Sequence, residues 1–143
     1  MAYTVLLVDD NTELLDLLAL ALEKLGGYAT ARAADGLAGL EMAMASKPDC
    51  MVIDILMPQL DGYQLVRTLR GDPDTADIPL IVLTALAQDK DRFASLASGA
   101  DYYLTKPVSI PDLVAAIQHA IAIGVAERAR LFQQLATDEE SEA

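Results

Sequence analysis

The stretch "VLLVDDN", Val5–Asn11, decides how the chain is read, because an unbroken apolar run ends abruptly in two adjacent carboxylates. Apolar side chains at consecutive positions, rather than at alternate ones, indicate a strand that is buried on both faces. Asn11 then offers a side chain that can cap a following helix. Asp9 and Asp10 repel each other, so their position at the end of a buried strand calls for a compensating charge elsewhere in the fold.

The same succession of a short apolar run and an amphipathic stretch repeats along the chain. Gly26-Gly27, Lys47-Pro48 and Gly99 end helical stretches, and Ser109 with Asp112 reads as a capping box. The pattern predicts five strands, at Thr4–Val8, Tyr28–Arg32, Cys50–Ile55, Leu80–Leu83 and Tyr102–Leu104. It also predicts five helices, beginning at about Asn11, Asp35, Tyr63, Gln88 and Ser109, the fourth ending at Ser98. Such alternation is typical of a doubly wound α/β domain with a parallel sheet, in which ligands bind at the carboxyl ends of the strands.

Composition limits the classes of function. The chain has 143 residues, 53% of them hydrophobic, which suits one domain with a proper core. A net charge of −12 argues against direct nucleic-acid binding, which needs a surplus of Lys and Arg. The single cysteine, Cys50, lies in an apolar run and reads as a small buried side chain. We find no apolar run long enough to span a membrane and no signal peptide, and therefore expect a cytoplasmic protein.

Polar residues gather at the carboxyl ends of the predicted strands. Asp9 and Asp10 follow the first strand, and Asp54 ends the third; Thr84 and Lys106 follow the fourth and fifth. Three carboxylates held close together favour a hard divalent cation, and oxygen ligands of this kind suit Mg²⁺. A carboxylate between a cation and a lysine can act as a nucleophile and accept a phosphoryl group as an acyl phosphate.

This combination resembles the receiver domain of two-component response regulators, including the chemotaxis regulators. The resemblance runs from Tyr3 to about Ile123 and rests on "LLVDDN", "MVIDILMPQLDG", "IVLTA" and "GADYYLTKP". It implies a flavodoxin-like fold with strand order 2-1-3-4-5. It also implies a phosphoacceptor switch and not an enzyme, with self-phosphorylation and self-dephosphorylation as its only chemistry.

The resemblance implies a phosphoacceptor site. Asp54 matches the aspartate that is phosphorylated, and Lys106 matches the lysine that contacts the phosphoryl group. Asp10 is expected to bind Mg²⁺ directly and Asp9 through water. Asp54 and the backbone carbonyl of Leu56 would complete the protein's metal ligands.

The resemblance also implies a switch. Thr84 matches the hydroxyl that is drawn to the phosphoryl group, and Tyr103 matches the aromatic residue that turns into the space vacated. Tyr102 is adjacent, so the choice of Tyr103 depends on a register of one residue. Pro107 is expected to be structural, because the Lys106-Pro107 bond is cis in this family.

A sensor histidine kinase or a histidine phosphotransfer protein is the implied phosphoryl donor. Phosphorylation is expected to reshape the face built from the fourth helix, fifth strand and fifth helix, and so to control a partner or an output domain. Neither nucleic acid nor a membrane is expected as a direct partner. A homodimer through that face or through the C-terminal helix remains open.

The sequence argues against three other functions. An aspartyl phosphatase usually has its two acids two residues apart after the first strand, whereas Asp9 and Asp10 are adjacent. An FMN-binding domain of the same topology offers hydroxyls and amides to its phosphate, which this acidic pair would repel. A degenerate receiver that only docks a partner would not need the complete acceptor set.

Two features depart from the family's usual pattern. Leu56 and Leu86, two residues after Asp54 and Thr84, are bulky and apolar where many members have polar or smaller residues. We hypothesise that they exclude the hydrolytic water and prolong the phosphorylated state. Beyond a receiver domain at residues 1–123, we expect a helical extension over 124–136, with Val125, Phe132 and Leu135 continuing an apolar stripe, and an acidic disordered tail over 137–143.

Overall fold

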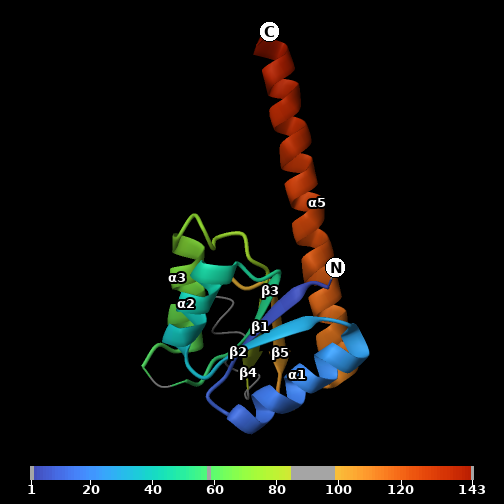
Figure 1. Cartoon of the computed structure of the whole chain (residues 1–143). Helices are drawn as coiled ribbons and strands as arrows, with labels where there is room; N and C mark the ends of the chain where they lie inside the picture. Colours follow the sequence, from blue (N-terminus) through green and yellow to red (C-terminus); the bar gives the residue numbers. More distant parts are fainter. Residues whose placement is uncertain (1, 58, 85–98, 143) are drawn as a thin grey trace.

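The protein forms one parallel sheet with helices on both faces (Figure 1). The computed structural model describes residues 2–57, 59–84 and 99–142. The strands are β1 (Thr4–Val8), β2 (Ala29–Ala33), β3 (Cys50–Asp54), β4 (Leu80–Thr84) and β5 (Tyr102–Thr105), in spatial order β2-β1-β3-β4-β5. The helices are α1 (Thr12–Gly26), α2 (Gly36–Ser46), α3 (Gly62–Gly71) and α5 (Ile110–Glu142). The predicted fold class and strand order are therefore confirmed, while the helix expected over Gln88–Ser98 lies outside the described residues.

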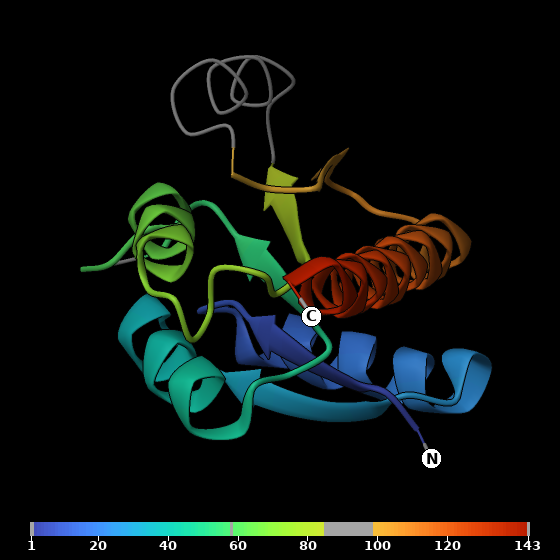
Figure 2. The same cartoon turned by 90° about the horizontal axis from the view of Figure 1, so that it is seen from above.

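The sheet lies between helices on its two faces (Figure 2), and an apolar layer packs on each face. On one face, residues such as Leu7, Val52 and Ile81 pack with buried residues of α1 and α5. On the other, residues such as Ile53 and Val82 pack with α2 and α3. Because neighbours along one strand point to opposite faces, β1, β3 and β4 are buried on both sides, as their unbroken apolar runs predicted.

Side-chain caps fix where the helices begin. Asn11 Oδ1 accepts the backbone N–H of Leu14 at 3.1 Å, and Asp35 Oδ1 accepts that of Ala38 at 2.7 Å. Before α5, Ser109 Oγ accepts the backbone N–H of Asp112 at 3.1 Å. The caps at Asn11 and Ser109, and a helix start at Asp35, were predicted from the sequence. Each cap satisfies a helical N–H that has no partner within the helix.

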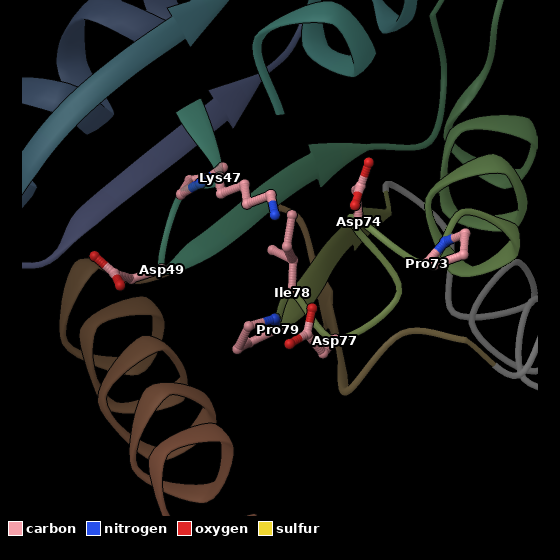
Figure 3. Close-up of a pocket in the computed structure, with 8 residues that line it drawn as sticks. Lys47, Asp49, Pro73, Asp74, Asp77, Ile78 and Pro79 are labelled. Carbon is pink, nitrogen blue, oxygen red and sulfur yellow. The ribbon is translucent and has the colours of Figure 1, made fainter. Parts of the chain in front are cut away.

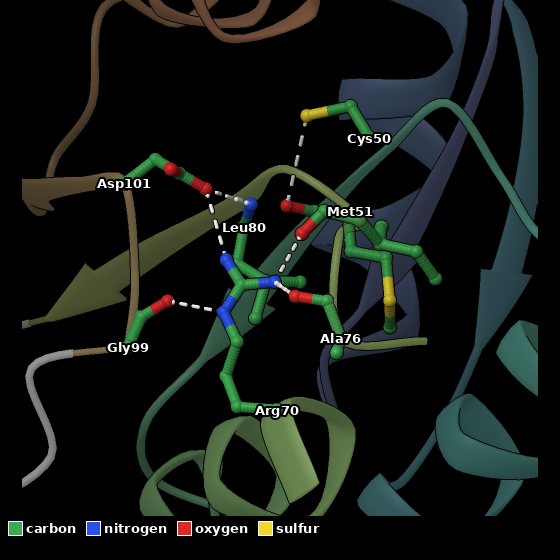
Figure 4. Close-up of polar contacts among 8 residues, drawn as sticks. Cys50, Met51, Arg70, Ala76, Leu80, Gly99 and Asp101 are labelled. Carbon is green, nitrogen blue, oxygen red and sulfur yellow. Dashed lines mark hydrogen bonds and ion pairs between the residues drawn. The ribbon is translucent and has the colours of Figure 1, made fainter. Parts of the chain in front are cut away.

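Arg70 joins three segments at the amino ends of β4 and β5 (Figure 4). Its Nε donates to the carbonyl of Gly99 at 2.6 Å, and Nη1 donates to the carbonyls of Ala76 and Ile78 at 2.8 and 2.6 Å. Nη2 donates to Asp101 Oδ2 at 3.0 Å. Burial lowers the pKa of the guanidinium, and the charge and hydrogen bond of Asp101 partly offset that effect. No pattern in the sequence predicts this set of contacts.

Helix α5 packs in the core with its amino-terminal part and projects from the domain with its carboxyl-terminal part (Figure 1). Leu113, Ile117 and Ile121 are buried against the sheet and α1, whereas Ile123 and Val125 are exposed. The structure describes this helix as far as Glu142, whereas the sequence led us to expect a helical extension over 124–136 and a disordered tail over 137–143. Residues such as Ala, Gln and Glu readily propagate a helix that packing has already nucleated.

Among the described residues, one window passes a length-and-composition test for a membrane span, at Ile110–Glu127 with mean hydropathy 1.3. We had expected no such stretch. Of this window 28% is buried, and its buried residues include Leu113, Ile117 and Ala120 of the domain core. A core helix of this kind passes the same test, so the finding is weak support for a membrane role.

Candidate phosphoacceptor site

Sheet register brings the predicted site residues to one edge. Val8 pairs with Ile53, so Asp9 follows β1 at the level where Asp54 ends β3. Asp54 pairs with Leu83, and Thr84 pairs with Thr105, which places Lys106 directly after β5 at the same edge. The carboxyl ends of four strands therefore meet there, as the parallel fold predicted.

The side chains of this edge form a charged cluster. Lys106 Nζ lies 2.8 Å from Asp54 Oδ1 and 3.5 Å from Asp9 Oδ2. Carboxylate oxygens of Asp9, Asp10 and Asp54 all lie within 4.8 Å of one another. Asp9 and Asp54 are buried, at 3% and 5% exposure, whereas Asp10 is exposed. Two buried carboxylates thus share one lysine, and a third carboxylate faces solvent.

Backbone contacts hold Asp9 in place. Its own N–H donates to the carbonyl of Ala33 at 3.1 Å, which ties the end of β1 to β2. The N–H of Asn11 donates to Asp9 Oδ1 at 2.9 Å. Asn11 therefore caps α1 through its side chain and orients an acid of the site through its backbone, a second role that the sequence did not reveal.

The charges of the cluster are not balanced. Burial raises the pKa of Asp54, the hydrogen bond from Lys106 lowers it, and the charges of Asp9 and Asp10 raise it again, with a net upward shift. Burial lowers the pKa of Lys106, but the hydrogen bond and charge of Asp54, together with Asp9, raise it above its usual value. One ammonium therefore does not neutralise the carboxylates, and their oxygen atoms fit a divalent cation in both charge and spacing.

Thr84 and Tyr103 lie on one face of the sheet. Tyr103 pairs with Val82, which lies two residues before Thr84 on β4 and hence points to the same side. Tyr103 packs against the apolar layer of α2 and α3, whereas Tyr102 packs against the layer of α1 and α5. The hydroxyl of Tyr102 is hydrogen-bonded to Nδ1 of His119. This arrangement supports Tyr103, and not Tyr102, as the residue that shares a side with Thr84.

Gly62 allows the chain to pass close behind the acceptor strand. A Cβ at this position would lie 2.7 Å from the Cα of Ile55 and 2.8 Å from the carbonyl oxygen of Asp54. The N–H of Gly62 also donates to the carbonyl of Ile55 at 3.0 Å. The missing side chain of Gly62 is therefore what permits α3 to begin against the end of β3.

Two bulky residues were expected beside the site. Leu56 is 63% exposed and, with Asp61 and Tyr63 among others, lines a shallow hollow of about 350 Å³ after β3. Leu86 lies outside the described residues. The Lys106-Pro107 bond is cis, as the resemblance implied.

A separate hollow of about 180 Å³ lies at the opposite, amino edge of the sheet (Figure 3). Lys47, Asp49, Asp74 and Asp77 are among its lining residues. Asp49 is already engaged, because its Oδ2 accepts the N–H of Thr4 at 2.8 Å. This hollow is remote from Asp54 and plays no part in the acidic cluster.

Comparison with known proteins agrees with the geometry. Residues 5–118 match the family described as the response regulator receiver domain. The DNA-binding dual master transcriptional regulator RpaA of Synechocystis sp. is 39% identical over 114 residues, which are 80% of this chain and 47% of that protein. The chain thus spans about half the length of this curated relative.

Solved structures give the same result. The signal receiver domain of a signal transduction histidine kinase from Syntrophus aciditrophicus has a TM-score of 0.77 at 35% identity, covering 85% of this chain and 91% of that one. The receiver domain of sensor histidine kinase PA1611 from Pseudomonas aeruginosa, solved with a magnesium ion in its active site cleft, also has a TM-score of 0.77, at 32% identity, with coverage of 85% and 99%.

Proposed function

The chain belongs to the receiver-domain family of two-component response regulators, and we propose from this premise that Asp54 accepts a phosphoryl group from a histidine kinase or a phosphotransfer protein. The observation that carries the proposal is the charged cluster at the carboxyl edge of the sheet. There the Asp54 carboxylate lies 2.8 Å from Lys106 and within 4.8 Å of oxygens of two further acids. We take residues 1–123 as the receiver unit.

Asp10, Asp54 and the backbone carbonyl of Leu56 would hold Mg²⁺ directly, with Asp9 acting through water. The fit rests on the close carboxylates and on the raised pKa of Asp54, which burial and the charges of Asp9 and Asp10 cause against the opposing effect of Lys106. When bound, the cation neutralises charge on the carboxylates and on the phosphoryl oxygens. The magnesium in the cleft of the PA1611 receiver domain supports this assignment.

The transfer uses the Asp54 carboxylate as nucleophile. One of its oxygens forms a bond to phosphorus while the bond from phosphorus to the donor's imidazole nitrogen breaks, and the imidazole leaves with the electron pair. Lys106 contacts the phosphoryl group from the side of β5 and supplies positive charge as negative charge accumulates. Loss of the group requires attack by water on phosphorus, which restores the carboxylate and releases inorganic phosphate.

Residues of β4 and β5 respond to the charge that phosphorylation adds. The phosphoryl group adds about −1.5 to −2 charges. The Thr84 hydroxyl hydrogen-bonds to a phosphoryl oxygen, and Tyr103, on the same side of the sheet, turns into the vacated space. The group thereby biases an existing equilibrium between two shapes of the face that β5 and α5 would form with the helix expected over Gln88–Ser98. That face controls a partner protein or an output domain.

The test is phosphorylation without a kinase. The chain is incubated with Mg²⁺ and a small acyl phosphate, and its mass is measured. Wild type should gain one phosphoryl group, Asp54→Asn should gain none, and Asp77→Asn, an exposed acid at the amino edge of the sheet, should behave as wild type. Absence of an adduct on wild type, or an adduct on Asp54→Asn, would refute the proposal.

A further inference from the structure

An apolar groove runs along the side of α5 that borders α1. Its first part, about 300 Å³, is lined by Leu25, Ile110, Pro111, Val114, Ala115 and Gln118. Its second part, about 160 Å³, is lined by Tyr3, Tyr28, Gln118, Ile121 and Ala122. Leu25 and Tyr3 are 72% and 46% exposed. Gln118 lines both parts, so they form one surface, which we call the α5 groove.

Helix α5 projects beyond its own domain, and the sequence of the projecting part includes apolar residues. An ideal Cβ at Gly124 would lie 3.4 Å from Pro79, which marks where the helix passes the edge of the domain. Beyond it, Val125 is 42% exposed. Val125, Phe132 and Leu135 follow Ile121 at helical spacing, so these positions fall on the α1 side of the helix. We call residues 125–142 the extension.

The extension matches the α5 groove in length and character. At 1.5 Å per residue, the groove between Pro111 and Ala122 is about 17 Å long and the extension is about 27 Å long. The extension of one copy is therefore long enough to cover the groove of another. Exposed apolar surface of this extent is generally covered in a stable assembly.

The distribution of charge along α5 favours antiparallel over parallel pairing of two copies. The sequence of the extension includes Asp138, Glu139, Glu140 and Glu142 near its end. The amino end of α5, at Ile110, is the positive pole of the helix dipole and carries one acid, Asp112, in its first turn. In an antiparallel pair, each acidic run lies near the amino end of the other copy's α5. A parallel pair would place the two acidic runs side by side, along with two domains of a chain whose net charge is −12.

We propose that two copies of this chain form an antiparallel dimer in which the extension of each packs into the α5 groove of the other. The surface lies on the α1 side of α5. It is separate from the β5 side, where His119 is hydrogen-bonded to Tyr102. The proposal needs no phosphoryl group, so its outcome is independent of the phosphoacceptor proposal above.

The first test is the mass of the full chain in solution by sedimentation equilibrium. Wild type should have twice the monomer mass of 15.3 kDa. Val125→Glu should raise the dimer dissociation constant at least ~10-fold, because it places a charge within the contact. Ile123→Glu is the matched control, since Ile123 is 47% exposed and about 160° around the helix from Val125. Circular dichroism should show that both variants retain the helix.

The second test fixes the orientation. Chains with Gln118→Cys and chains with Gln133→Cys are mixed and treated with a short bismaleimide. The antiparallel pair predicts a cross-link between the two kinds of chain and none within either kind, because like positions lie about 22 Å apart along the helix axis. The native Cys50 should not interfere, since it is fully buried and burial raises its pKa to about 12.

Several results would overturn the proposal. These are a monomeric wild type at the highest soluble concentration, a dimer that survives Val125→Glu, and a dimer weakened equally by Ile123→Glu. A cross-link between two Gln118→Cys chains would reject the antiparallel arrangement. A dimer through the β5 side would appear as insensitivity to Val125→Glu.

Discussion

Replacing Asp54 by Asn should stabilise the domain in the absence of divalent cations and should lose that advantage when Mg²⁺ is added. Asp54 is 5% exposed and shares Lys106 with Asp9. The amide removes one buried charge and keeps nearly the same shape. If the three carboxylates form a cation site, their repulsion should lower the free energy of unfolding when no cation is bound. Binding of the cation should raise the free energy of unfolding again.

The distances give the magnitude. At an effective dielectric constant of ~20, unit charges 4.8 Å apart interact by about 3.5 kcal/mol, and charges 2.8 Å apart by about 6 kcal/mol. Repulsion from Asp9 and Asp10 therefore roughly offsets the attraction of Lys106, with the effect of Asp10 reduced because that side chain is exposed. The desolvation of the buried Asp54 carboxylate is then not compensated by favourable interactions. We therefore expect Asp54→Asn to raise the free energy of unfolding by about 1–2 kcal/mol.

Mg²⁺ should reverse the order of stability. A cation at 100 times its dissociation constant stabilises the protein that binds it by about 2.7 kcal/mol, and Asp54→Asn lacks one anionic ligand.

The pH dependence of the stability difference has a definite sign. Because the pKa of Asp54 is raised, mainly by burial, its charge destabilises the fold at neutral pH, and this penalty disappears as pH falls through the folded-state pKa towards 3.8. The difference between the two proteins should shrink over that range.

Urea unfolding with EDTA and with saturating Mg²⁺ is the assay, and Asp77→Asn is the control. The control should remain within about 0.5 kcal/mol of wild type under both conditions. The reasoning fails if Asp54→Asn is less stable than wild type in EDTA, or if Mg²⁺ stabilises both proteins equally.

Three further changes test other parts of the structure. Gly62→Ala should destabilise the domain by about 1–3 kcal/mol in urea unfolding, because its Cβ would lie 2.7 Å from the Cα of Ile55, whereas Gly71→Ala, with no atom within 4 Å, should be near neutral. Arg70→Met should cost about 3 kcal/mol or more in guanidinium unfolding, since buried carbonyls and Asp101 lose their donor, and exposed Arg67→Met should cost less than about 0.5 kcal/mol. Leu56→Asn should shorten the phosphoryl lifetime several-fold, as followed by mass after removal of the donor, while Leu17→Asn on α1 should not; equal lifetimes would reject a water-excluding role for Leu56.

Local chemistry explains why much of the fold was predictable. The unbroken apolar runs of β1, β3 and β4 identify strands buried on both faces, and the helix starts at Asn11 and Asp35 follow from a single capping side chain. Strand β2 was placed one residue early. Its pattern of exposed and half-buried residues is typical of an edge strand and gives a weaker signal.

The contacts that escaped prediction join residues far apart in the chain. Arg70 binds backbone carbonyls of Ala76, Ile78 and Gly99, and carbonyls carry no sequence signal. Likewise, His119 is hydrogen-bonded to Tyr102, which lies 17 positions away on a strand, so residue spacing gives no sign of this contact. The members of the acidic cluster were predicted because each directly follows or ends a strand, and parallel register then brings them together.

The continuity of α5 has a mechanical consequence. The helix is anchored in the core as far as Ile121, and residues 125–142 form an arm about 27 Å long with no break in between. A rigid arm converts rotation at its base into displacement at its tip, so a tilt of ~5° at the core would move the far end by about 2 Å. Any repacking of the buried turns of α5 would thus produce a larger displacement at the end of the helix and at any molecule that contacts it.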